Sequence, residues 1–256
     1  MVEPDAESVL SQDQAGVRFE WGPAGAAHLA AESSCLVVVD VLSFTTAVSV
    51  AVGRGMAVYP YRWNDSGGEE FASAHGAELA VRRKAVDAEH PWSLSPVHLA
   101  KARVTPRLVL PSPNGSAIAA AATGTVVAGC LRNAAAVSAW IVGHEYGSVD
   151  RPAVVVASGE RWPDGSLRPA LEDALGAGAI LDHLNRHRLD LSAESRAMAT
   201  MYHAIPDVAE TVRSCVSARQ LEQAGYNGDV EMAVEIDTDE TVPLLTNGAF
   251  RTPSVA

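Results

Sequence analysis

The sequence predicts an α/β fold with three layers (α/β/α), in which helices cover both faces of a largely parallel or mixed central sheet. Short runs rich in β-branched residues alternate with alanine-rich segments along most of the 256 residues. Several of these runs are apolar at consecutive positions, as strands that are covered on both faces should be. Because no low-complexity linker, internal repeat or composition break divides the chain, we expect residues 1–256 to form a single domain.

Five apolar, β-branched runs are the expected strands, at 35–42, 56–61, 107–111, 125–130 and 153–157. The expected helices are rich in alanine and other helix-favouring residues, and they lie at 44–52, 68–83, 116–122, 134–144 and 170–187. A right-handed β-helix-β order then places helices on both sides of the sheet. The GAGA stretch lies inside the last of these helices, where small residues allow close packing, so it does not indicate a dinucleotide-binding loop.

Three other parts of the chain depart from this alternation. Residues 1–16 are expected to be a flexible N-terminus. Residues 87–106 contain three prolines and predict a long irregular connection, which is a candidate lid. Residues 190–256 are interpreted as a helical and β C-terminal extension, with a helical stretch at 192–224 and short strands at 230–236 and 242–245.

Charge and cysteine content limit the partners and the compartment. The formal net charge of −12 argues against nucleic acid or an anionic membrane, which are bound mainly through Lys and Arg. A small anionic substrate would need an arginine or a metal ion as a local positive centre. No apolar run approaches the ~20 residues of a membrane span, and the N-terminus lacks the pattern of a signal peptide. Cys35, Cys130 and Cys215 have no metal-ligand spacing, so we interpret them as reduced, non-catalytic core residues of a cytoplasmic protein.

Polar residues follow four of the expected strands, where ligands bind in open α/β sheets. The runs end in a carboxylate, amides and guanidiniums, and the helix N-termini that come next add free N–H groups for a phosphate. These candidate residues are Asp40; Asn114, Gly115 and Ser116; Arg132 and Asn133; and Glu160 and Arg161.

Each of these residues also has a structural interpretation. Asp40 and Asn133 fit helix N-caps, and Asn114 followed by Gly115 is a common turn. Glu172 and Asp173 lie in the first turn of a predicted helix, where the helix dipole favours acids without any catalytic role. The structural interpretations do not explain why Asp40 and Glu160 follow similar buried strands, and this repetition favours a functional site.

Five segments resemble the 2-phosphosulfolactate phosphatase (ComB) family and occur in the family's order. They are DVLSFTTAVSVAVGRG, LPSPNGSAIAAAA, VVAGCLRNAAAVSAWI, SGERWPDGSLRPALEDALGAGAIL and VEIDTDETVPLL. The resemblance covers most of the chain from Cys35 onward. It implies a three-layer α/β/α fold and a Mg²⁺-dependent phosphomonoesterase that releases phosphate from 2-phospho-3-sulfolactate, on the way to coenzyme M.

With this resemblance, the acidic residues become a candidate Mg²⁺ site that takes one or two direct carboxylates and several waters. The expected metal ligands are Asp40, Glu160, Glu172 and Asp173. Asp40, Glu160 and Arg161 are the expected catalytic residues. The sequence does not decide whether Asp40 acts as a metal ligand, a base or a nucleophile. The expected substrate-binding residues are Ser43, Asn114, Gly115, Ser116, Arg132 and Asn133. The expected partner is a small phosphorylated anion. A homodimer is possible, and the sequence does not decide the oligomeric state.

The chain departs from the family pattern at a few positions. Ser43 stands where the family usually has an arginine, and Leu94 stands at a family asparagine. In AVRRK, Arg82 or Arg83 falls near an expected glutamate. Serine cannot replace the charge with which an arginine binds phosphate or sulfonate, although Arg54 or Arg82 could supply that charge from another loop. The alternative function is a catalytically impaired family member that binds an anionic metabolite or a protein partner.

Overall fold

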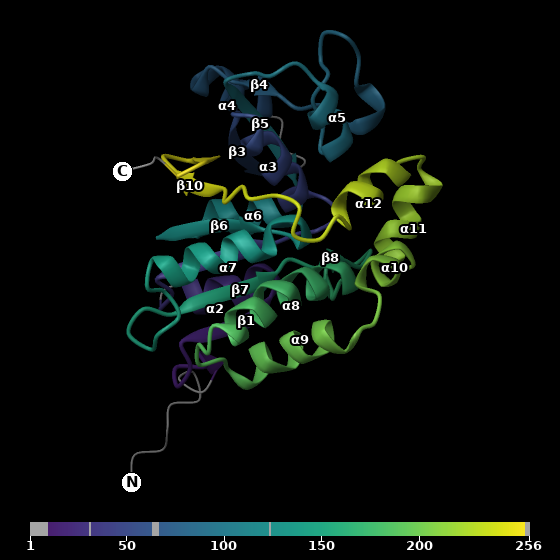
Figure 1. Ribbon diagram of the computed structural model, residues 1–256. Helices are drawn as coiled ribbons and strands as arrows, with labels where there is room; N and C mark the ends of the chain where they lie inside the picture. The colour runs from purple at the N-terminus through teal and green to yellow at the C-terminus, as the bar shows by residue number, and fades with distance from the viewer. Residues whose placement is uncertain (1–9, 31, 63–66, 123, 254–256) are drawn as a thin grey trace.

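The computed structural model of the protein describes residues 10–30, 32–62, 67–122 and 124–253 (Figure 1). Within these residues the main feature is a nine-stranded sheet with the order β1-β7-β2-β6-β10-β11-β3-β5-β4. A separate two-stranded hairpin is formed by β8 (Glu160–Arg161) and β9 (Leu167–Arg168). The strands of the large sheet are β1 (Val17–Trp21), β2 (Cys35–Val39), β3 (Ala57–Arg62), β4 (Glu78–Leu79), β5 (Arg107–Ser112), β6 (Thr125–Gly129), β7 (Ala153–Ala157), β10 (Leu244–Thr246) and β11 (Ala249–Arg251).

The large sheet consists of two parallel blocks joined by an antiparallel hairpin. Strands β1, β7, β2 and β6 pair in parallel, as do β3, β5 and β4. The hairpin β10–β11 lies between the blocks and pairs antiparallel with β6 on one side and with β3 on the other. Strand direction therefore reverses across the hairpin. The C-terminal segment, which the sequence presents as an extension, completes the centre of the sheet.

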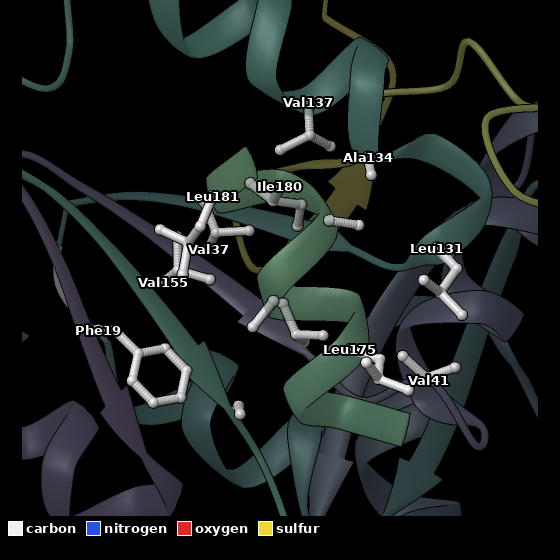
Figure 2. Close-up of a cluster of buried hydrophobic side chains, with 14 of the residues drawn as sticks. Phe19, Val37, Val41, Leu131, Ala134, Val137, Val155, Leu175, Ile180 and Leu181 are labelled. Atoms are coloured by element: carbon white, nitrogen blue, oxygen red, sulfur yellow. The ribbon is translucent and has the colours of Figure 1, made fainter. Parts of the chain in front are cut away.

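Alternate residues of the strands face two different hydrophobic layers, as the pleat of a strand requires. On one face, Val37 and Val155 pack against Leu175, Ile180 and other side chains of α8, and Figure 2 shows these groups together. The opposite face packs on α2, α3 and α6. Both faces of the central strands are thus covered by helices, which confirms the three-layer fold.

The described helices lie on both faces of the sheet and at its ends. In Figure 1, α7, α8 and α9 cover the face toward the viewer, and α10 to α12 lie at one end. None of the described helices combines the length and the apolar character that a membrane span needs. Their bounds are α2 (Gly22–Ala30), α3 (Phe44–Gly53), α4 (Gly68–His75), α5 (Pro96–Lys101), α6 (Gly115–Ala121), α7 (Ala134–Gly143), α8 (Leu171–Arg186), α9 (Ala193–Ala204), α10 (Val208–Arg213), α11 (Val216–Gln223) and α12 (Asn227–Ala233).

The small residues of α8 allow the close packing that the sequence predicted. A Cβ added at Gly178 would lie 2.7 Å from the backbone oxygen of Met198 in α9, and one at Gly176 would lie 2.6 Å from Val41. Both positions therefore require glycine because a neighbouring element comes too close for a side chain. The helix packs tightly against α9 on one side and against the loop after β2 on the other.

Two predicted elements are wrong. The helix expected at 68–83 ends at His75, because Gly76 adopts a left-handed conformation with φ of 56° and the chain then enters β4. The strand expected at 230–236 is mostly the helix α12. Its buried residues Val230 and Ala233, with Val234 at the C-cap, have the i, i+3, i+4 spacing of a helix face.

The structure also places elements that the sequence did not predict. Strand β1 and helix α2 precede the first expected strand. Of the segment 1–16, residues 1–9 lie outside the described residues. In the remainder, Ser11 and Ala15 are buried, and the Gln12 side chain donates to the backbone oxygen of Phe19 at 2.8 Å. The second half of this segment therefore packs on the fold.

Candidate active site

Asp40 lies where β2 gives way to α3, and its carboxylate is held by backbone amides from two parts of the chain. Oδ1 accepts the N–H of Phe44 at 3.1 Å, and Oδ2 accepts the N–H of Gly115 at 3.0 Å. The Thr45 hydroxyl accepts the Asp40 N–H and donates to the Asp40 carbonyl oxygen. The bond to Phe44 resembles the capping role that the sequence suggested. The bond to Gly115, 75 residues away, joins the two parallel blocks.

The turn after β5 contacts two carboxylates at once. The Asn114 side chain donates from Nδ2 to Glu160 Oε2 at 3.0 Å, while the next residue, Gly115, donates its N–H to Asp40. A Cβ at Gly115 would lie 2.6 Å from the Phe44 ring and 2.9 Å from Asp40 Oδ2, so only glycine permits this approach. The carboxyl ends of β2, β5 and β7 therefore meet, although β5 belongs to the other block of the sheet.

Burial and mutual repulsion raise the pKa values of these carboxyl groups. The pKa of Asp40 rises to about 6, mainly because burial disfavours the charged form, although the amides of Phe44 and Gly115 oppose the rise. Burial likewise raises the pKa of Glu160 to about 7, and the neighbouring charge of Asp40 adds to the effect. Two acidic groups that share a poorly hydrated site favour a bound cation or a retained proton.

Glu172 and Asp173, at the start of α8, are buried and have different partners. Asp173 accepts the N–H of Val41 at 2.8 Å and the N–H of Gly159 at 2.9 Å. Burial, followed by the charges of Asp40 and Glu172, raises the pKa of Asp173 well above its ordinary value. Glu172 Oε2 accepts the thiol of Cys215 at 3.3 Å. Both acids bind protein groups rather than face an open space.

A cavity of about 310 Å³ lies beside Asp40 and Glu160. This volume is in the usual range for sites that bind small molecules. Its walls come from segments that are distant in sequence: the ends of β2 and β5, the loops around η1 (Arg83–Ala85), the start of β8, and α11. The residues that line it are Asp40, Leu42, Ser43, Val81, Arg83, Leu94, Ser112, Pro113, Asn114, Glu160, Ser217, Gln220 and Leu221.

Arg83 is the one basic residue among those that line the cavity. Its Nη2 donates to Ser43 Oγ at 2.7 Å, and its Nε donates to Asp229 Oδ2 at 3.1 Å. Arg54, which the sequence offered as a possible source of charge, instead donates to the carbonyl oxygens of Leu99 and Ala102, and Arg82 does not line the cavity. The AVRRK stretch was the only sequence signal for Arg83, and it could not distinguish the two adjacent arginines.

The structure places four other candidate residues outside the cavity. Arg132 donates to the Met232 carbonyl oxygen and the Glu235 carboxylate. Asn133 is fully buried and binds backbone groups of Cys130, Ala128 and Thr241. The Arg161 guanidinium donates to the Gly165 carbonyl oxygen, and the Ser116 hydroxyl donates to Ser112 and Tyr61 carbonyl oxygens. We leave these four side chains out of the candidate site because their polar groups serve the fold.

The donor set for a metal ion is smaller than the four carboxylates expected from sequence. In the described part of the chain, no group of three or more His, Cys, Asp or Glu side chains is arranged to hold a metal ion. Asp40 and Glu160 are the two carboxylates that line the cavity. Mg²⁺ commonly uses one or two protein carboxylates and completes its octahedron with water and substrate oxygens, so this pair fits that ion.

Comparisons with known proteins identify the family of the chain. A sequence model of the 2-phosphosulpholactate phosphatase family matches residues 24–248. The chain is 27% identical over 226 residues to a probable 2-phosphosulfolactate phosphatase of Thermotoga petrophila, covering 86% of this chain and 92% of the relative. It is also 27% identical over 227 residues to a protein with the same description from Thermotoga maritima, with the same coverage. A third such protein, from Caldanaerobacter subterraneus subsp. tengcongensis, is 28% identical over 130 residues, about half of each chain. The family match spans β2 to β10 and every segment that lines the cavity, and the chain belongs to the 2-phosphosulpholactate phosphatase family.

Proposed function

We propose that this protein is a Mg²⁺-dependent phosphatase that hydrolyses 2-phospho-3-sulfolactate to 3-sulfolactate and phosphate. One observation carries the proposal: the turn of Asn114 and Gly115 fixes Asp40 and Glu160, which follow strands distant in sequence, on the wall of one cavity. That cavity also contains the guanidinium of Arg83. The family match and the names of the relatives support a phosphate ester as the substrate.

Asp40 and Glu160 would hold the ion. Their raised pKa values reflect burial and repulsion that a bound cation would relieve. When bound, Mg²⁺ supplies positive charge for the phosphoryl oxygens and for the leaving alkoxide. Ser112 adds a polar group at the same place, because its buried hydroxyl lines the cavity and has no hydrogen-bond partner within the described residues.

The side chains of the cavity can orient the reaction and move its proton. Asn114 holds Glu160 through Oε2, and among the described residues Glu160 Oε1 has no hydrogen-bond partner. Glu160 can therefore accept a proton at Oε1 from the attacking water. The water oxygen forms a bond to phosphorus, the ester P–O bond breaks, and the proton passes to the leaving alkoxide oxygen, which becomes the hydroxyl group of 3-sulfolactate.

A phosphate-release assay tests the proposal. With Mg²⁺, the protein should release phosphate from 2-phospho-3-sulfolactate, and a chelator should abolish the release. Millimolar Mg²⁺ should also raise the melting temperature, because the ion binds only the folded protein. The shift should disappear in Asp40→Asn and persist in Asp164→Asn, which removes an exposed carboxylate outside the cavity.

The alternative function is a catalytically impaired family member that binds an anionic metabolite. Ser43 favours it, because a neutral hydroxyl occupies a position where the family usually has a cation. Binding of 2-phospho-3-sulfolactate without phosphate release, at any Mg²⁺ concentration, would support this alternative. The guanidinium of Arg83 beside Ser43 argues against it, because the positive charge is present from another segment.

A further inference from the structure

Arg83 reaches the cavity from a segment that is distant in sequence from both carboxylates. It begins η1, between β4 and α5, and its side chain contacts Ser43 at the start of α3 and Asp229 in α12. The charged residues that line the cavity are Asp40, Glu160 and Arg83. An anionic ligand in this cavity therefore has one basic side chain to bind.

The guanidinium is fixed by several contacts and keeps one nitrogen available. Nε donates to Asp229, and Nη2 donates to Ser43 Oγ and, at 3.3 Å, to the Leu94 carbonyl oxygen. The Tyr226 ring lies 5.4 Å from Cζ, within the range of a cation–π contact. Nη1 has no hydrogen-bond partner among the described residues, and 19% of the side chain is exposed. The arginine is thus positioned before a ligand arrives and retains a donor for it.

Asp229 explains why the side chain holds this orientation. Its carboxylate is only 2% exposed and also accepts the Ser95 hydroxyl and the Val97 N–H at 3.4 Å. A buried ion pair of this kind adds little net stability, because desolvation of both charges offsets their attraction. Its clearer effect is geometric: Asp229 binds Nε while Ser43 and Leu94 bind Nη2, and together these contacts hold the guanidinium at the cavity wall.

We propose that Arg83 binds the anionic group that the substrate carries in addition to its phosphate, such as a sulfonate or a carboxylate, and thereby selects esters with more than one anionic group. The identity of the ester rests on the proposed function. Asp40 and Glu160 occupy the cavity's acidic part, where a cation and the phosphate would sit. Arg83 supplies a fixed positive group with planar donor geometry for the second anion, and its charge-assisted hydrogen bond is stronger than a neutral one.

The test compares 2-phospho-3-sulfolactate with ethyl phosphate, which has no second anionic group. In Arg83→Gln, kcat/KM for 2-phospho-3-sulfolactate should fall by about 10- to 100-fold, the usual effect of losing a charged hydrogen bond, whereas kcat/KM for ethyl phosphate should change by less than about threefold. Arg83→Lys should recover only part of the loss. Arg213→Gln is the matched control: it removes an exposed arginine paired with Glu231 and should change neither value. An equal loss for both esters, or no loss for either, would overturn the proposal.

Two additions keep the test decisive. Arg83→Gln leaves Asp229 buried without its cation, so Arg83→Gln/Asp229→Asn provides a variant without that unpaired charge if the single variant fails to fold. Calorimetry with 3-sulfolactate measures the contact without turnover, and Arg83→Gln should raise its Kd about tenfold or more. If the wild type binds 3-sulfolactate through Arg83 but releases no phosphate, the proposed function fails and this inference stands. If the Kd is unchanged by the substitution, this inference fails.

Discussion

Two pairs of acids, all buried except the half-buried Glu160, lie near the carboxyl ends of β2 and β7, and only one pair lines the cavity. Asp40 and Glu160 line it, whereas Glu172 and Asp173 bind groups of the protein. All four are acidic residues next to strand ends or a helix start, and with the family resemblance all four were expected to be metal ligands. Asp40 and Asp173 each accept two backbone N–H groups, so hydrogen bonds to the backbone do not separate the pairs. The comparison shows that the difference between them is contact with the cavity.

The second pair supports the first through its neighbours in the chain. Asp173 accepts the N–H of Val41, the residue after Asp40, and the N–H of Gly159, the residue before Glu160. One carboxylate therefore fixes the two backbone segments that carry the cavity acids. This arrangement predicts different consequences for substitutions in the two pairs.

Asp40→Asn should have the largest effect on turnover. The substitution keeps the shape of the side chain and removes the charge that would bind Mg²⁺. We expect kcat to fall by about 10³-fold, which corresponds to the several kcal/mol that a metal contributes to the transition state. Phosphate release and a melting curve are the measurements. A folded Asp40→Asn protein with more than about a tenth of wild-type activity would contradict the assignment of Asp40 to the reactive pair.

Asp173→Ala should affect stability more than any other substitution in these two pairs. It leaves the buried N–H groups of Val41 and Gly159 without acceptors, and each unsatisfied buried group costs about 1–3 kcal/mol. We expect the free energy of unfolding to fall by about 2–4 kcal/mol in a urea titration. Asp173→Asn keeps one oxygen acceptor and should cost less. Equal stability of Asp173→Ala and the wild type would show that this carboxylate does not support the two segments.

The free energy of unfolding of the metal-free protein should depend on pH through three carboxyl groups. The pKa values of Asp40 and Glu160 are raised to about 6 and about 7, and that of Asp173 is also raised, above the values near 4 of the unfolded chain. Between pH about 4 and 7 the folded protein binds more protons than the unfolded chain, so the free energy of unfolding falls as the pH rises.

Glu160→Gln removes one of these titrating groups and provides the measurement. With a chelator present, the variant should be more stable than the wild type by about 1–3 kcal/mol at pH 8, and the difference should disappear near pH 4. Urea titrations at several pH values would show it. A variant that is less stable than the wild type at pH 8 would mean that the Glu160 carboxylate stabilises the metal-free fold, contrary to its raised pKa.

The parts of the fold that the sequence predicted are those with strong local patterns. Consecutive β-branched residues located the central strands, and their ends located Asp40 and Glu160. The apolar pattern of 230–236 fits a strand as well as a helix. In the structure this segment lies mostly in α12, where Asp229 and Val230 are buried against neighbouring elements. Strands β10 and β11 have three residues each, too few for a reliable pattern. Arg83 was not singled out because it lies in a short 3₁₀ turn, and its position depends on contacts with residues 40 and 146 positions away.

Glu172→Gln should have the smallest effect of the four substitutions in the two pairs, and it tests the comparison most closely. Glu172 is 2% exposed and accepts the Cys215 thiol, which can donate to an amide oxygen as well as to a carboxylate oxygen. Its negative charge contributes to the raised pKa values of Asp40 and Asp173, so its removal relieves repulsion without removing a hydrogen-bond acceptor. We therefore expect turnover within about threefold of the wild type, an unchanged Mg²⁺-induced rise in melting temperature, and a metal-free protein that is about 1 kcal/mol more stable at neutral pH. Loss of the Mg²⁺ shift in this variant would instead make Glu172 a metal ligand. The two pairs would then form one acidic cluster, as the sequence alone suggested.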